Sequence, residues 1–303
     1  MKFPELSMEK LIKRIQASKG KVRMVLDTDT FNEVDDQFAL AYALRSPESM
    51  TVEAVYAAPF LNERAESPED GMEKSYNEIL NIMKLMNIPQ SECVYKGSRN
   101  YLVDGETPQE SEAARDLVKR AMACDDEPLY VVCIGAITNV ASAILMEPSI
   151  IEKIVVVWLG GNELDYPHTM EFNLMQDIHA SRLILDCGVP LIHIPCNSVT
   201  THLLTTIPEL EYYLKGRSEI GTYLTEIVSN YKDATFAWSK VIWDIVTIAW
   251  LINPEWVSTS IVHSPILTDQ MTWSFDLQRH FISTATAVDR DKIFGDLFKK
   301  LAQ

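Results

Sequence analysis

Short apolar runs alternate with longer amphipathic or alanine-rich segments along most of the chain. A short apolar run without alternation is typical of a strand buried on both faces, whereas apolar residues three and four apart are typical of a helix. We expect strands at residues 24–26, 51–57, 93–95, 129–134, 154–159, 190–194, 257–262 and 281–286. We expect helices at residues 6–17, 38–44, 72–86, 110–124, 139–145, 176–186 and 291–301, and through much of 208–253.

The order strand, turn, helix repeats at least five times along the chain. This rhythm predicts an α/β fold in which helices flank a mainly parallel sheet. A length of 303 residues permits one large domain or two modest ones. Because the chain has no internal repeat, low-complexity tract or Gly/Ser/Pro-rich linker, we expect a single domain over residues 1–303.

The turn after the first strand carries four acids within ten positions: Asp27, Asp29, Asp35 and Asp36. In open α/β sheets, ligands bind beyond the carboxyl ends of the strands. One interpretation is that single Asp residues close the turn and cap the next helix. The other is a metal or catalytic site, because crowded carboxylates stay ionised together only beside a positive charge. We favour the second for the set, with Ca2+ or Mg2+ as the cation.

Later strand ends add further candidate groups. The end at Ile134 offers a backbone carbonyl, and the adjacent Gly135 lets another group approach closely. The strand that ends at residue 159 leads, through Gly-Gly-Asn, to Glu171 and Asn173. Asp244 lies in the apolar stretch VIWDIVTIAWLI, where a carboxylate is costly unless it is paired or bound to metal. A buried Asp that is hydrogen-bonded or caps a helix is an equally open interpretation.

The composition limits the binding partners and the cellular compartment that we expect for this protein. The net charge of -16 disfavours nucleic acid and anionic membranes as partners, since both attract basic patches. Five scattered cysteines without a CxxC pair favour buried thiols in a reducing compartment over a zinc site. The first residues lack the apolar core of a signal peptide, and no apolar run approaches the length of a membrane span. We therefore expect a cytoplasmic protein that acts on a small molecule.

Taken together, these segments resemble the nucleoside hydrolases, the calcium-dependent, inosine-uridine preferring N-ribohydrolases. Members of that family open with a strand that ends in Asp-x-Asp, followed by two adjacent Asp residues that start a helix. The matching segments here are residues 26–29, 35–36, 135–139, 159–162, 171–173 and 243–244. Each match is weak alone, but together they occur in the family's order over most of the chain.

The resemblance implies a hydrolase that cleaves the N-glycosidic bond of ribonucleosides, or of a related N-riboside, with a Ca2+-bound water. Asp29, Asp36 and Asp244 would ligate Ca2+ through their side chains, and Ile134 through its main-chain carbonyl. Asp35 would be the general base, and Asp27 would support the turn from behind the ligands. Glu171 and Asn173 would hold ribose hydroxyls, and Asp165 falls where the family commonly has an Asn near the sugar. Relatives of this kind are commonly homodimers or homotetramers.

The carboxylates suit this chemistry. Cleavage of an N-glycosidic bond builds positive charge on the sugar, and nearby carboxylates stabilise that charge.

The chain also departs from the family pattern. Residues 30–34 stand where the family has three residues, so this loop is two residues longer. We favour an insertion without a role over a substrate contact from Asn32 or Glu33. The Asn expected after the second strand is missing, and Asn62 is the candidate replacement.

Trp243 stands where many members carry a His that protonates the leaving base. A Trp cannot donate that proton, but Trp243 and Trp238 are candidates to stack on a base, with a place in the core as the alternative. His168 is the only histidine near the site by sequence, and we expect it at the surface.

Two other functions compete. Without a visible acid for the leaving group, the chain would be a non-catalytic relative that binds ribosides or metal. The opening motif also partly resembles haloacid-dehalogenase-type phosphatases, with Asp27 as nucleophile and Asp29 as acid/base. That family's later Asp pair should follow a strand, whereas Gly295-Asp296 falls in the final predicted helix, so we rank it last.

Overall fold

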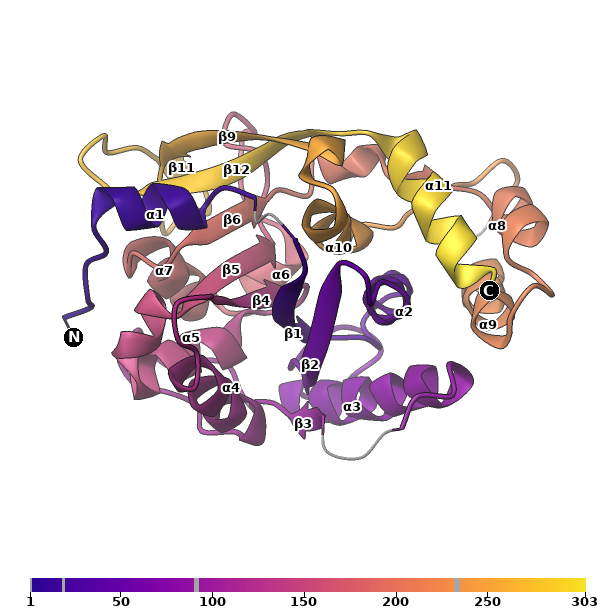
Figure 1. Ribbon diagram of the computed structural model, residues 1–303, viewed down its shortest axis with the longest axis horizontal. Helices are drawn as coiled ribbons and strands as arrows, with labels where there is room; N and C mark the ends of the chain where they lie inside the picture. Colours follow the sequence, from indigo (N-terminus) through magenta and orange to yellow (C-terminus); the bar gives the residue numbers. More distant parts are fainter. Residues whose placement is uncertain (1, 18–19, 90–92, 232–234) are drawn as a thin grey trace.

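An eight-stranded sheet forms the centre of the computed structural model, which describes residues 2–17, 20–89, 93–231 and 235–303 (Figure 1). The strands lie in the order β3-β2-β1-β4-β5-β6-β12-β9. Their bounds are β1 Val22–Thr28, β2 Met50–Ala57, β3 Val94–Lys96, β4 Leu129–Cys133, β5 Ile154–Leu159, β6 Leu191–Ile194, β9 Val257–His263 and β12 Phe281–Val288. Neighbouring strands run parallel except β9, which is antiparallel to β12.

The helices are α1 Met8–Arg14, α2 Asp36–Leu44, α3 Pro68–Leu85, α4 Glu112–Met122, α5 Thr138–Met146, α6 Phe172–Gln176, α7 Ile178–Asp186, α8 Ile207–Tyr213, α9 Glu219–Ser229, α10 Ile245–Ile252 and α11 Arg290–Leu301. Two short pairs of strands lie outside the main sheet, β7 (Leu204–Thr205) with β8 (Lys240–Val241) and β10 (Ile266–Leu267) with β11 (Trp273–Ser274). The predicted fold class, a single α/β domain with a mainly parallel sheet flanked by helices, is confirmed.

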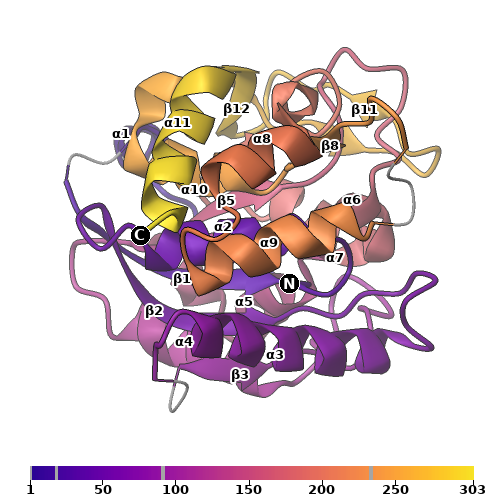
Figure 2. The ribbon, with the colours of Figure 1, turned by 90° about the vertical axis from the view of Figure 1, so that its right-hand side faces the viewer.

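The helices cover both faces of the sheet (Figures 1 and 2). Helices α2, α10 and α11 pack on one face, and α4, α5 and α7 pack on the other. Strand β1 shows how the sequence serves both layers: Met24 and Leu26 join the first core, and Val25 joins the second. Side chains alternate between the two faces of a strand, so a strand covered on both sides is apolar throughout.

The chain reverses its direction of travel across the sheet between β1 and β4. From β1 it proceeds outward to β2 and β3, and it then returns to add β4, β5 and β6 on the other side of β1. Asp27 at the end of β1 pairs in register with Cys133 at the end of β4. Crevices at such switch points are where ligands of open α/β sheets bind.

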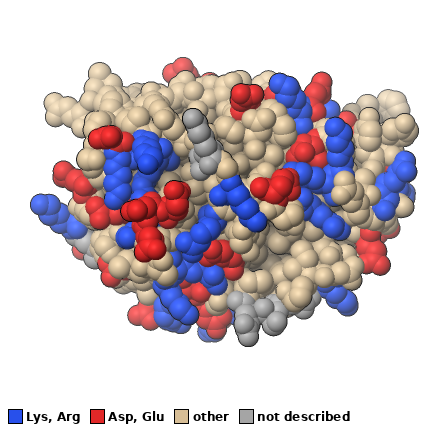
Figure 3. Space-filling view, viewed as in Figure 1, with Lys and Arg blue, Asp and Glu red and all other residues tan. Residues whose placement is uncertain are grey.

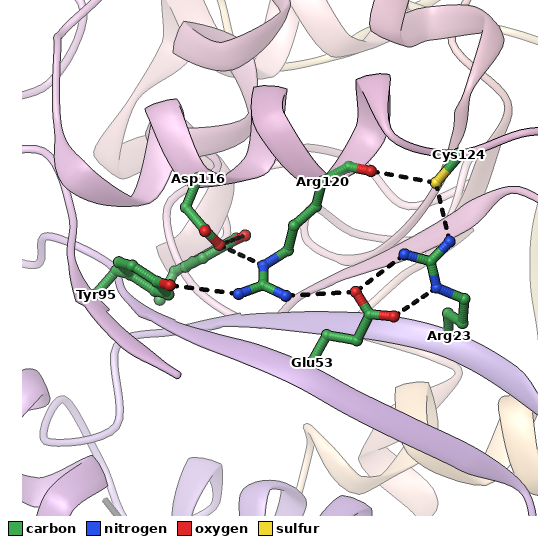
Figure 4. A network of polar contacts seen from close by, with 7 residues as sticks. Arg23, Glu53, Tyr95, Asp116, Arg120 and Cys124 are labelled. Atoms are coloured by element: carbon green, nitrogen blue, oxygen red, sulfur yellow. Dashed lines mark hydrogen bonds and ion pairs between the residues drawn. The ribbon is translucent and has the colours of Figure 1, made fainter. Parts of the chain in front are cut away.

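Near the opposite end of β1, a polar network ties β1, β2 and β3 to α4 (Figure 4). Arg23 donates to Glu53 (2.5 Å between Nε and Oε1), which also accepts from Arg120 (3.4 Å). Arg120 further pairs with Asp116 (2.6 Å) and donates to the Tyr95 hydroxyl (3.3 Å). This network of paired charges holds α4 on the sheet. None of its residues belongs to the acidic turn.

The face of the molecule drawn in Figure 3 carries Lys and Arg side chains interspersed with Asp and Glu. No helix among the described residues is long and apolar enough to cross a membrane.

The structure differs from the predicted elements at two places. No helix was predicted between the strand at 154–159 and the helix at 176–186, but α6 begins at residue 172 because Glu171 caps it by accepting the N–H groups of Asn173 and Leu174. The helical pattern expected through 208–253 is broken into α8, α9 and α10, with β8 between the last two. Pro208 stands in the first turn of α8 and Ser218 caps α9, so local start signals divide the segment.

Candidate active site

Hydrogen bonds among its own residues close the acidic turn. The N–H of Asn32 donates to the Asp29 carbonyl (2.7 Å), and the Thr28 hydroxyl donates to Asp36 Oδ1 (2.5 Å). Because Thr28 ends β1 and Asp36 begins α2, the second bond joins strand and helix across the loop. Asp35 occupies the N-cap position of α2, yet its side chain makes no capping hydrogen bond. The two adjacent carboxylates are therefore held at the start of α2, where the Asp35 side chain does not cap the helix and Asp36 accepts the Thr28 hydroxyl through Oδ1.

Asp244 joins this pair from the far end of the chain. Carboxylate oxygens of Asp35, Asp36 and Asp244 lie within 4.8 Å of one another, and all three residues are buried. Asp244 occupies the N-cap position of α10, also without a capping hydrogen bond, and α10 packs against α2. The amino ends of two helices thus meet at the cluster, where their dipoles favour negative charge.

Asp29 lies beside the cluster and is fully buried. Within the described chain, neither of its carboxylate oxygens has a hydrogen-bond partner. A Cβ atom on Gly135 would lie 2.9 Å from Asp29 Cγ, so the glycine leaves room for this carboxylate. Buried carboxylates without partners are costly unless a cation neutralises them. Asp29, Asp36 and Asp244 together offer the all-oxygen donors that hard divalent cations take.

The electrostatics of the cluster fit the same interpretation. Burial, followed by repulsion from Asp35, raises the pKa of Asp36 from an ordinary 3.8 to about 8. Burial and neighbouring carboxylates also raise the pKa values of Asp29 and Asp244 well above the usual range. At neutral pH these groups ionise together only if positive charge is brought among them.

Asp27 points elsewhere. It is fully buried and accepts a hydrogen bond from Asn139 Nδ2 (2.7 Å), and burial raises its pKa to about 7. Asn139 in turn accepts from the backbone N–H and the hydroxyl of Ser98. Asp27 is not among the described residues that line the cavity of the site. Its bond to Asn139 ties β1 to the first turn of α5.

Glu171 and Asn173 lie where β4 and β5 end. Glu171 accepts the N–H groups of Gly161 (2.7 Å), Asn173 (3.0 Å) and Leu174 (3.1 Å). Asn173 Nδ2 donates to the carbonyls of Ile134 (3.2 Å) and Leu159 (3.0 Å). The carbonyl of Ile134 is therefore oriented by Asn173 at the edge of the same cavity.

A cavity of about 890 Å³ opens over the cluster. The three clustered acids line this cavity. Glu171, Asn173 and Ile134 line it as well. Its lining also includes three aromatic side chains from the later part of the chain, Tyr223, Tyr231 and Trp243. One cavity thus brings together an acidic floor, polar groups and flat rings, which suits a sugar joined to a heterocycle.

A sequence model of the family described as inosine-uridine preferring nucleoside hydrolase matches residues 24–295. The chain belongs to this family. The predicted resemblance is confirmed, and with it the expected enzyme class at the level of the family. The match covers every segment of the candidate site from the acidic turn to Asp244.

Individual relatives agree with the family. The pyrimidine-specific ribonucleoside hydrolase RihA of Klebsiella pneumoniae is 25% identical over 266 residues, covering 78% of this chain and 81% of that protein. The solved purine-preferring ribonucleoside hydrolase from Gardnerella vaginalis has a TM-score of 0.74 at 19% identity and covers 92% of this chain and 98% of its own. A solved inosine-uridine preferring nucleoside hydrolase from Bacillus anthracis has a TM-score of 0.68 at 17% identity. The match covers 94% of this chain and 99% of that protein's chain. These structures share the fold of this chain.

Family membership argues against the phosphatase alternative. The nucleophile in that alternative was Asp27, which is buried away from the cavity and hydrogen-bonded to Asn139.

In this nucleoside hydrolase, the loop of residues 30–34 is anchored at several points. Glu33 forms an ion pair with Lys240 of β8. The Arg64 guanidinium donates to the Glu33 carbonyl (2.9 Å). The same guanidinium lies 4.4 Å from the centroid of the Phe31 ring. Asn62 donates to Asn32 Oδ1 (2.8 Å). Asn32 and Glu33 line the cavity, so this loop forms part of its wall.

The remaining candidates divide between cavity and surface. Trp243 lines the cavity, whereas Trp238 stacks on Tyr231 with ring centroids 5.8 Å apart and is not among the lining residues of the described chain. Asp165 is exposed and His168 is half-buried, and neither lines the cavity. The structure thus brings the three clustered acids and Trp243 to one cavity, whereas Asp29 lies beside the cluster and Asp165 lies outside.

Sequence reasoning missed the wall formed by α3 and α9. Glu78 of α3 and Tyr223 of α9 both line the cavity, and the Tyr223 hydroxyl donates to Glu78. The signal was present but weak: Glu78 falls on the same buried helical face as Ser75, Ile79 and Ile82. An acid on an otherwise buried stripe indicates a polar partner or a cavity.

Proposed function

We propose that this protein hydrolyses the N-glycosidic bond of ribonucleosides, or of a related N-riboside, to ribose and a free base. The observation that carries the proposal is the convergence of Asp35, Asp36 and Asp244 at one cavity, from segments far apart in a chain of the nucleoside hydrolase family. The relatives named above act on ribonucleosides according to their names, which supports the same bond as the target.

In this proposal, Asp29, Asp36 and Asp244 hold a Ca2+ ion through their side chains, and Ile134 does so through its carbonyl. The unpartnered oxygens of Asp29 and the raised pKa values of the cluster support that donor set. A bound Ca2+ would supply positive charge that lowers the pKa of the attacking water and grips the sugar diol.

The side chains have separate tasks. Asp35 accepts the proton of the attacking water, whose oxygen bonds to the anomeric carbon as the bond to the base breaks. The surrounding carboxylates stabilise the positive charge that develops on the ribose ring. Glu171, Asn173 and Trp243 contact the substrate, with the amide and acid at the sugar and the indole against the base. Asp165 is exposed, so its predicted sugar contact would require the loop before α6 to close over the substrate.

The test is Asp35→Asn. Loss of the general base should lower kcat by about 100- to 10,000-fold in a reducing-sugar assay on a nucleoside panel, while the metal content stays unchanged. Asp125→Asn, at an exposed position outside the cavity, is the matched control. Activity that survives in Asp35→Asn would remove Asp35 from the role of base.

One observation favours a second candidate, a non-catalytic relative that binds ribosides. None of the six histidines of the chain is among the described residues that line the cavity, so an imidazole acid for the leaving base is absent from its wall. A binding titration with the same nucleosides, run beside the reducing-sugar assay, decides between the two candidates. Saturable binding without release of reducing sugar would establish the non-catalytic relative.

The proposal includes the protein's setting. We expect one domain over residues 1–303, a small-molecule substrate and no nucleic-acid or membrane partner. We also expect a homodimer or homotetramer in the cytoplasm, where the five free cysteines would stay reduced.

A further inference from the structure

The cavity is strongly acidic beyond its metal-binding cluster. Seven acidic side chains line it within the described chain, against one basic side chain: Glu33, Asp35, Asp36, Glu63, Glu78, Glu171 and Asp244 against Arg64. A divalent cation in the cluster would offset two of these charges and leave the cavity negative. A negative cavity concentrates cations and repels anions.

The one basic side chain of the lining is committed to the loop. Arg64 Nη1 donates to the carbonyls of Asn32 (3.4 Å) and Glu33 (2.9 Å), and its guanidinium covers the Phe31 ring. Lys240, which pairs with Glu33, is not among the lining residues. Arg64 therefore shapes the wall and is poorly placed to hold an anionic substrate group.

No histidine among the described lining residues stands ready to protonate a departing base. Trp243 lines the wall but has no proton to give to a base, and the Tyr223 hydroxyl donates to Glu78 Oε1. Glu78 is 7% exposed and accepts at its other oxygen from Asn81 Nδ2 (3.2 Å), so both of its oxygens act as acceptors. The described lining thus places no imidazole where a neutral nucleoside needs an acid.

This matters because a neutral base that leaves without a proton departs as an anion. General acid catalysis of such a step is worth about 100- to 10,000-fold. A base whose ring already carries a positive charge needs no proton, because it departs neutral. A ring cation also gains from nearby carboxylates and from the face of an indole.

We propose that the preferred substrates are N-ribosides with a positively charged ring as the base, such as pyridinium ribosides or 7-alkylated purine ribosides. The inference rests on the proposed function and names its substrate class. The C1′–N bond breaks, and its electron pair passes to the ring nitrogen and neutralises the base. The water oxygen bonds to C1′, and Asp35 takes the water proton. Trp243 and Glu78 form the wall that receives the cationic ring.

The first test compares 7-methylguanosine with guanosine on the purified, metal-loaded enzyme. Each kcat/KM is divided by the spontaneous hydrolysis rate of that compound, because ring-charged ribosides are more labile by themselves. We expect the normalised value for 7-methylguanosine to equal or exceed that for guanosine, because an enzyme that supplied an acid to the leaving base would raise the guanosine value alone, by about 100-fold. A normalised value about 100-fold higher for guanosine would overturn the inference.

A second pair separates a charged ring from a charged substituent. In 5-(3-aminoallyl)uridine the ammonium group is pendant, so the ring nitrogen still needs a proton when it leaves. We expect its gain over uridine to be much smaller than the gain of 7-methylguanosine over guanosine. A gain of the same size would show recognition of any positive charge and would contradict the leaving-group argument.

Binding tests charge recognition without turnover. We expect 1-methylnicotinamide, which is cationic, to raise the melting temperature of the wild-type enzyme, and neutral nicotinamide to do so far less. In Glu78→Gln the preference for the cation should fall about fivefold. Glu66→Gln, an exposed acid outside the cavity, should keep it. Equal binding of both compounds by the wild type would overturn the inference, even if Glu78→Gln does not fold.

The two proposals fail differently. If no riboside in the panel is hydrolysed, the proposed function fails. If neutral nucleosides are hydrolysed as efficiently as cationic ones, the function stands and only the substrate class is wrong.

Discussion

At the scale of single residues, the carboxylates of the site are held in a costly arrangement. Asp36 has a folded-state pKa of about 8 against an ordinary 3.8, and the pKa values of Asp29 and Asp244 are raised as well. A group whose pKa is higher in the folded state stabilises the fold below its unfolded pKa, and this contribution is lost as the pH rises through the folded value.

We therefore predict that the metal-free protein loses thermal stability between pH 7 and pH 9. The buried His193 and His280, whose pKa values burial lowers to about 4, are neutral throughout this window and do not mask the effect. Adding Ca2+ should restore the melting temperature most strongly at the alkaline end, because the ligands bind it ionised. Scanning calorimetry of EDTA-treated and Ca2+-loaded samples provides the measurement. A metal-free melting temperature that is constant or rises over this range would contradict the account.

The close approach of Asp29 to Gly135 leads to a second prediction at this scale. In Gly135→Ala the added Cβ would lie 2.9 Å from Asp29 Cγ, so Asp29 must move. We expect metal affinity to fall about tenfold or more, as for other changes just behind metal ligands. Isothermal titration with Ca2+ measures this, and Gly105→Ala, at a site with open space around it, is the control. Unchanged affinity in Gly135→Ala would mean that Asp29 is not a ligand.

At the scale of elements, the loop between β1 and α2 is anchored to β8 by the ion pair of Glu33 with Lys240. The Lys240 side chain is 8% exposed and that of Glu33 is 35% exposed, so the pair is only partly shielded from water. We predict that Lys240→Met lowers the free energy of unfolding by about 1–2 kcal/mol, because Glu33 then keeps a partly buried, unpaired charge.

Urea denaturation of a double-mutant cycle checks this. Adding Glu33→Gln to Lys240→Met should recover part of the loss, since it removes the unpaired charge. Additive losses in the double variant would mean that the two side chains are not coupled.

The helices and strands also show which parts of the structure the sequence could predict and which it could not. Buried strands such as β4 and β5 were predictable because an apolar run between turn residues has few alternatives. Helix α6 was not, because its start depends on Glu171 acting as a cap, whereas the family resemblance implied only a sugar contact for this residue. Likewise, Glu78 and Tyr223 meet only through the packing of α3 against α9, which no local pattern encodes.

At the scale of the whole molecule, the strand order places the site. The reversal between β1 and β4 brings the acidic turn beside Ile134 and Gly135, and α10 delivers Asp244 by packing on α2. The identities of these residues were visible in the sequence, but their nearness was an inference from the family pattern. The cavity wall and the contacts of Arg64 with the loop of residues 30–34 are properties of the folded chain alone.

The central claim is that residues from both ends of the chain hold one cation. A crystal structure of the protein grown with Ca2+, with anomalous difference density to locate the ion, tests it most directly. The account predicts one peak about 2.3–2.6 Å from oxygens of Asp29, Asp36 and Asp244 and from the Ile134 carbonyl. A peak that lacks Asp244, or no peak at a saturating concentration, would contradict it.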